Sequence, residues 1–443
     1  MFPNPQDAFP LPLRPSLEQY KKLAKDLVRA CKSGEAGAIH LWAARWIETL
    51  ARLSSSTIEA ESSARAEHTV DLLVEFARRK LVDSKPAKCR LTDAQFIIAR
   101  SHGFESWNRF SAHVGAMVAA NSSVTRFEQA ADAIVAGDTE ALERLLGESP
   151  VLIRARSTRE HRATLLHYVA ANGVENFRQK TPPNIVQVAE ILLSHGSAVD
   201  AEADVYGGGA TTLELVSTSA HPERAGVQKE LIQILLEHGA ALDHTGSAGH
   251  RHSLVAACLA NGRGRAAEYL AERGAPLDLE GAAGVGRLDV VQSLLAPDGG
   301  SITTLPKTQI ERGFLWACEY GRNDVIEFLL RCGVDLHTVA DTGQTGLHWA
   351  VIGAQTDTIK LLVARGAALE AKNAYGGTAL GQALWSAVNG DAGIDYLPAI
   401  AALLDSGAKI DEGSLAWLAG QSEGSALTKQ RVTEELRRHG ATT

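Results

Sequence analysis

Apolar residues recur at helical spacing through the first quarter of the chain. Within residues 17–32 they fall at positions 20, 23, 27 and 30, on one face of a helix, and Ser16 stands where an N-cap is expected. The same spacing predicts further helices over about 38–53, 63–81, 92–101 and 106–119. Five prolines in residues 1–15 predict an extended arm instead. We therefore expect an arm at 1–15 and a helical domain at 16–120.

From about residue 126 the apolar pattern repeats over a longer distance. The stretch Gly313–Gly333 can be laid on Gly346–Gly366 at a constant offset of 33, which places Trp316 on Trp349. A glycine closely follows the apolar pair that ends each second helix, and it is expected to stop that helix in the left-handed conformation. These glycines are Gly196, Gly239, Gly274, Gly333, Gly366, Gly407 and Gly440. Such a period predicts stacked units that each bury their apolar face only against their neighbours.

The motif Thr345-Gly346-Leu347-His348-Trp349-Ala350, together with the period of 33, makes residues 126–443 resemble ankyrin-repeat proteins. The resemblance implies an all-α solenoid of about nine helix-turn-helix units with short β-hairpins. It also implies a structural role for His348, which in the family bonds backbone of an adjacent repeat. The preceding helical domain, with Leu91–Gln95 and Phe104–Trp107, resembles the leader of many bacterial ankyrin proteins of unassigned role.

Charge and composition narrow the classes of partner. The net charge is −8, and residues 1–120 carry +4 against −12 for the remainder. An acidic array argues against nucleic acid as the partner, because phosphate binding needs concentrated lysine and arginine. No run approaches 18 apolar residues, and the N-terminus has neither the basic nor the apolar region of a signal peptide, so we expect no membrane partner.

The five cysteines lack the CxxC spacing of metal or redox sites. Cys258 and Cys318 occupy small-residue positions inside repeats. We interpret the set as buried reduced thiols and expect a cytoplasmic protein with neither a metal site nor a cofactor.

One position of each repeat lies between the histidine and the alanine of the motif. Its side chain is not needed for packing between helices and is expected to point into the concave groove. It is occupied by Tyr168, Leu215, Ala256, Gly281, Trp316, Trp349, Gln382 and Trp417. Tyr320 lies four residues after Trp316, on the same helix face, with Glu319 between them. Because neighbouring first helices pack about 8–10 Å apart, Trp316, Trp349 and Tyr320 are predicted to form one aromatic surface.

The hairpin tips add polar and aromatic side chains that suit the rim of a binding site. They are His161 (with Glu160 and Arg162), Tyr206, Tyr375 and the run His250-Arg251-His252.

Three interpretations of the aromatic surface remain open. The leading one is a protein-binding scaffold that holds a partner segment, anchored by Trp316, Trp349 and Tyr320. A second is a hydrolase, a lyase or a receptor for a sugar-like small molecule, in which Glu319 and a second carboxylate, Asp341 or Asp204, perform acid–base work. The third is internal packing, with the helical domain or an inserted loop folded over the rings.

Overall fold

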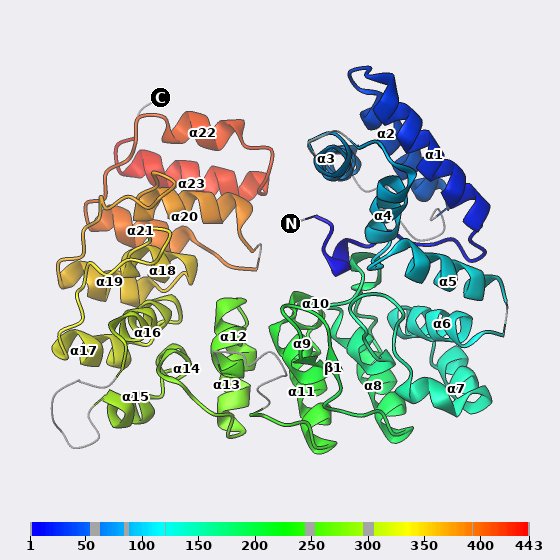
Figure 1. Cartoon of the computed structure of the whole chain (residues 1–443). Helices are drawn as coiled ribbons and strands as arrows, with labels where there is room; N and C mark the ends of the chain where they lie inside the picture. Colours follow the sequence, from blue (N-terminus) through cyan, green and yellow to red (C-terminus); the bar gives the residue numbers. More distant parts are fainter. Residues whose placement is uncertain are drawn as a thin grey trace. The chain divides into compact units, whose positions relative to one another are not determined.

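A computed structural model describes residues 2–53, 63–83, 88–119, 121–243, 253–295, 305–391 and 393–441 of the chain. It is 63% helix and 2% strand, which confirms the predicted all-α class. The chain divides into two compact units, Met1–His250 and Arg251–Thr443, whose helices Figure 1 labels in chain order.

The first unit begins with the predicted helical segment. Its helices are α1 (Leu17–Ser33), α2 (Ala38–Leu53), α3 (Ser63–Leu81), α4 (Leu91–Ser101) and α5 (Trp107–Val118). They share one apolar core that includes Leu27, Trp46, Leu73, Ile97 and Phe110. Ser16 caps α1 by accepting a hydrogen bond from the backbone of Gln19, as the sequence predicted.

The N-terminal arm is packed against this helical segment. Apart from the 3₁₀ turn η1 (Pro5–Asp7), residues 2–16 are not helical. The ring of Phe9 meets Trp46 edge to face at 5.3 Å, and the Phe9 carbonyl lies 2.9 Å from Nδ1 of His102. The arm is therefore part of the core of the first unit.

Paired helices follow in the first unit. They are α6 (Ser123–Ala136) with α7 (Thr139–Glu148), η3 (Leu165–Ala170) with α8 (Ile185–Ser194), and α9 (Thr212–Thr218) with α11 (Gln228–Glu237). The short elements between them are η2 (Pro150–Arg154), η4 (Asn176–Arg178), α10 (Ala220–Arg224), and the antiparallel strands β1 (Glu202–Ala203) and β2 (Ala210–Thr211).

The second unit contains further helix pairs. They are α12 (Leu254–Ala260) with α13 (Gly264–Glu272), α14 (Leu279–Val285) with α15 (Leu288–Leu295), α16 (Lys307–Glu319) with α17 (Asn323–Arg331), α18 (Gly346–Ile352) with α19 (Thr356–Ala364), α20 (Ala379–Asn389) with α21 (Leu397–Asp405), and α22 (Ser414–Gly420) with α23 (Ala426–Arg438). One core cluster runs through α14–α23, and its members come from both the first and the second helices of these pairs.

One repeat shows why the motif folds as it does. His348 Nδ1 accepts from the backbone N–H of Thr345 at 3.3 Å in a capping box, and His348 Nε2 lies 3.1 Å from the Gly377 carbonyl of the next hairpin. Burial lowers the pKa of His348, so the ring is neutral and links two repeats as predicted. The repeat ends at Gly366, whose φ of 91° is the left-handed value that glycine adopts without strain.

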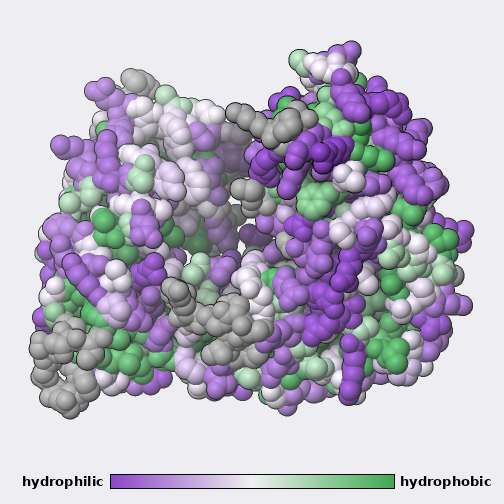
Figure 2. All heavy atoms as spheres, viewed as in Figure 1, coloured by the Kyte–Doolittle hydropathy of each residue, from purple (hydrophilic) through white to green (hydrophobic). Residues whose placement is uncertain are grey.

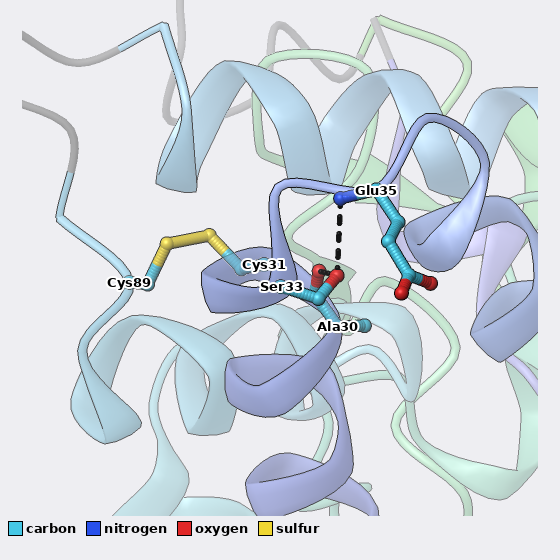
Figure 3. The surroundings of a disulfide bond; sticks show 5 residues. All are labelled: Ala30, Cys31, Ser33, Glu35 and Cys89. Atoms are coloured by element: carbon cyan, nitrogen blue, oxygen red, sulfur yellow. Dashed lines mark hydrogen bonds between the residues drawn. A yellow bond between two sulfur atoms is a disulfide. The ribbon is translucent and has the colours of Figure 1, made fainter.

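The cysteines differ in part from the prediction. Cys258 and Cys318 are free and buried, but Cys31 and Cys89 form a disulfide that joins the end of α1 to the segment before α4 (Figure 3). Their Cα atoms lie 5.9 Å apart, within the ordinary range for a disulfide. This disulfide was not predicted from the sequence, because 58 residues separate the two cysteines and only the packing of α1 against α4 brings them together.

Hydrophilic and hydrophobic residues are mixed on the face seen in Figure 2. Across the described ranges, no helix is both long enough and apolar enough to cross a membrane.

Candidate functional site

The aromatic cluster of Trp316, Tyr320 and Trp349 lies on neighbouring first helices of the second unit. The rings of Trp316 and Trp349 meet edge to face, with centroids 4.8 Å apart and planes at 89°. Tyr320 follows at 6.4 Å from Trp316. All three side chains are partly exposed, so the repeat register places one aromatic surface across α16 and α18.

Hydrogen bonds from two other first helices hold the cluster in place. Trp316 donates its indole N–H to the carboxylate of Glu280 on α14 at 3.2 Å, and Tyr320 donates its hydroxyl to the carbonyl of Leu259 on α12 at 2.7 Å. The Tyr320 ring also lies against Gly264, where a Cβ would come within 2.5 Å of it. Fixed rings lose little conformational entropy on binding, which favours a recognition surface.

Glu319 is the last residue of α16, lies between Trp316 and Tyr320 in the sequence, and is partly exposed. Burial raises its carboxyl pKa to about 8, so at neutral pH the group is mostly protonated. Within the described ranges, this carboxyl makes neither a hydrogen bond nor an ion pair. A carboxyl with a raised pKa can act as a general acid, or it can bind a cation that a ligand supplies.

The second carboxylates of the enzymatic alternative are placed differently. Asp341 is fully exposed in the hairpin before α18, and its side chain lies 4.0 Å from Arg312. Asp204 is exposed in the hairpin between β1 and β2 and belongs to the first unit.

Tyr168 and His161 are not surface residues, contrary to the prediction. Both are fully buried in the first unit, at 0% exposure. The guanidinium of Arg178 covers the Tyr168 ring at 5.8 Å, and His161 Nε2 lies 3.4 Å from the carboxylate of Glu175. The segment after η3 closes over the position that the repeat register leaves open.

These two residues belong to a buried ionic network. Arg159 bonds Glu128 at 2.6 Å and Glu175 at 2.9 Å, and Arg178 bonds Glu128 at 2.8 Å and Asp132 at 2.6 Å. Burial disfavours charge on Glu128, but the two arginines outweigh it and lower its pKa to about 2. The same balance lowers the pKa of Glu175 well below its ordinary value. Paired and hydrogen-bonded in this way, the network is structural.

Sequence reasoning missed this network because its members are separated by up to 50 residues along the chain. A partial signal was present in the charged hairpin around Arg159 and in Arg178, which lies in a segment longer than the repeat requires.

The remaining rim residues are exposed but differ in their contacts. Tyr206 is 60% exposed and donates its hydroxyl to Asn172 and to Gln6 of the N-terminal arm. Tyr375 is 81% exposed and Trp417 is 37% exposed. The run 250–252 lies outside the described residues. Trp385, not singled out from the sequence, is 52% exposed on α20. Its register with Glu319, two periods of 33 earlier, was the available signal.

The arginine side chains around the aromatic cluster interact with carboxylates or with other polar groups. Arg322 bonds Glu268 and donates to the Gly284 carbonyl at 2.9 Å. Arg263 lies close enough to Tyr320 and Asp391 to interact with both electrostatically. In the parts of the chain that the structure describes, no group of three or more His, Cys, Asp or Glu residues is arranged to hold a metal ion.

Comparisons with known proteins identify the repeats. Residues 314–413 match the family model described as ankyrin repeats, in three copies. The crystal structure of the human ASB11 ankyrin repeat domain is similar at 21% identity, covering 64% of this chain and 99% of that chain, with a TM-score of 0.33. None of the curated proteins compared with the chain matches it.

Proposed function

Because the chain carries ankyrin repeats at 314–413, we propose that its second unit is a protein-binding scaffold that holds a partner segment along its first helices. The observation that carries the proposal is the aromatic cluster. Three large rings from two repeats pack together and all remain partly exposed, and hydrogen bonds fix two of them, Trp316 and Tyr320. Binding energy at protein interfaces is concentrated in such aromatic anchors.

The surface extends beyond the cluster by register. Trp385 and Trp417 are exposed on the next two first helices, α20 and α22. An extended segment that crosses four repeats would meet an aromatic side chain at each of them. Exposed aromatic groups in series favour a partner chain over a single small ligand.

The enzymatic alternative has one observation in its favour, the raised pKa of Glu319, which suits a general acid. It also needs a second carboxylate at a defined distance. Asp341 is fully exposed in a hairpin, and Asp204 is exposed in another. The binding function therefore has the stronger support.

Cytoplasmic placement, expected from the sequence, is opposed by one observation. Disulfides such as Cys31–Cys89 are rare in reducing compartments. The redox state of this pair in protein isolated from its native cells tests the placement.

Site-specific photocrosslinking tests the binding function. A photoreactive residue at Gln382, on the first-helix layer, should crosslink one discrete partner from native lysate, whereas the same residue at Lys360 of α19 should not. Trp349→Ala should abolish the crosslink and leave the thermal midpoint within a few degrees of wild type. Equal crosslinking at both positions contradicts the proposal, as does a large loss of stability in Trp349→Ala.

A further inference from the structure

Among the described residues, the Glu319 carboxyl has no cationic partner. It projects from α16 three residues after Trp316 and beside Tyr320, and its carboxyl has neither a cation nor a hydrogen-bond donor among the described residues. Burial is the cause of its raised pKa, and a nearby arginine or lysine would have lowered it. The carboxyl is therefore an acceptor without a donor, on a partly exposed surface.

A second carboxylate lies at the N–H edge of the Trp316 indole. Glu280 is only 6% exposed and accepts the indole N–H at 3.2 Å. Glu280 thus places a carboxylate against one ring of the cluster, and Glu319 follows Trp316 by three residues on the same helix. Aromatic faces flanked by carboxyl groups attract cations through the ring quadrupole and through direct charge pairing.

The cationic side chains nearby already interact with other groups. Arg322 bonds Glu268 and the Gly284 carbonyl, and Arg263 interacts with Tyr320 and Asp391. Among the described residues of the second unit, none supplies a cation that pairs with Glu319.

We propose that the aromatic cluster and Glu319 receive the protonated side chain of a lysine or arginine from the bound partner segment. This rests on the proposed function and names the chemistry of the partner: a basic residue inserted among Trp316, Tyr320 and Trp349. The alkyl stem of such a residue packs on the rings while its charged head reaches the carboxyl.

Binding of the cation is coupled to proton release. Below about pH 8 the Glu319 carboxyl is protonated, and it must ionise to pair with the cation. Affinity should therefore rise with pH up to about 8 and then level off, since lysine itself stays charged to about pH 10. Tyr320 and Tyr396 interact with Glu319, but burial raises the pKa of both, so they stay neutral in this range. The charged groups beyond them are Arg263, Arg322 and Asp391.

The test uses the full-length chain and four short peptides. Each is a capped Gly-Ser-X-Ser-Gly sequence in which X is lysine, arginine, norleucine or citrulline. Indole fluorescence and calorimetry measure the Kd at several pH values. At pH 8.5 the two basic peptides should bind at least tenfold more tightly than their neutral counterparts. Between pH 6 and 8 the Kd of the basic peptides should fall by about tenfold per pH unit, as one proton is released.

Three variants locate the effect. Glu319→Gln should remove both the preference for basic peptides and the pH dependence, while the norleucine peptide binds as before. Glu327→Gln, on the second helix α17 where it pairs with Arg331 and Arg365, should change neither. Trp349→Ala should weaken all four peptides alike.

Three results would overturn the proposal. The first is norleucine binding as tightly as lysine, and the second is no binding of any peptide. The third is a preference for basic peptides that survives Glu319→Gln. Crosslinking at Gln382 judges the protein-binding function independently, so a discrete crosslinked partner with no basic preference would refute this inference alone.

Discussion

The buried ionic network predicts a large and local cost for removing one charge. Glu175 is fully buried, accepts hydrogen bonds from Arg178 at 3.4 Å and Tyr168 at 3.5 Å, and lies 2.9 Å from the Arg159 guanidinium and 3.4 Å from His161 Nε2. The substitution Glu175→Gln keeps the shape of the side chain but removes its charge and presents an amide to two guanidinium groups. The first unit should lose stability as a result.

The size of the expected stability loss depends on which ion pairs Arg159 and Arg178 retain in Glu175→Gln. Breaking a buried ion pair costs about 3–5 kcal/mol when a charge is left uncompensated. Here Arg159 and Arg178 both retain Glu128, and Arg178 also retains Asp132. We therefore expect the lower end, about 3 kcal/mol. In a unit of this size that lowers the thermal midpoint by about 6–12 °C.

Calorimetry of the full-length chain measures the shift, and hydrogen exchange over residues 123–178 localises it. Asp132→Asn is the matched control, because Asp132 pairs with the same Arg178 but its side chain is 53% exposed. An exposed pair is worth about 0–1 kcal/mol. If Glu175→Gln costs no more than Asp132→Asn, the network does not stabilise the first unit and the reasoning is refuted.

Three further predictions follow from the same packing. Two buried arginines outweigh the effect of burial and lower the Glu128 pKa to about 2, so its contribution to stability is present above about pH 4.5 and lost as the pH falls toward 2; in denaturation followed by circular dichroism, Glu128→Gln should be less stable than wild type above about pH 4.5, and the difference should shrink as the pH falls toward 2. Gly353→Ala should cost several kcal/mol in denaturant melts because the new Cβ would lie 1.7 Å from the Glu319 carbonyl oxygen, and equal stability would show that α16 and α18 pack less closely. Non-reducing peptide mapping should recover Cys31 joined to Cys89, and reduction should destabilise the first unit by up to about 4 kcal/mol for a loop of 58 residues; two free thiols would contradict the pairing.

The sequence determined the architecture because a repeat array is held together by contacts between neighbours. A period of 33 specifies which side chains of adjacent units meet, and each unit repeats the same local interactions. The register that set Trp316 on Trp349 was therefore enough to predict two neighbouring indoles, and the structure has their centroids at 4.8 Å. The Thr345 and His348 cap and the glycine at position 366 are local in the same way.

Only the tertiary structure decided which aromatic positions remain accessible. Tyr168 occupies the same motif position as Trp316, yet it is fully buried, because Arg178 and Glu175 from the following segment close over it. The partners of that network come from positions up to 50 residues away, and no periodic pattern encodes such a meeting. The raised pKa of Glu319 is likewise a property of its surroundings, since its burial, and the absence of a cation beside it among the described residues, depend on how several helices pack. Local periodicity determines the repeat architecture, whereas the exposure and the charge state of individual side chains depend on long-range packing.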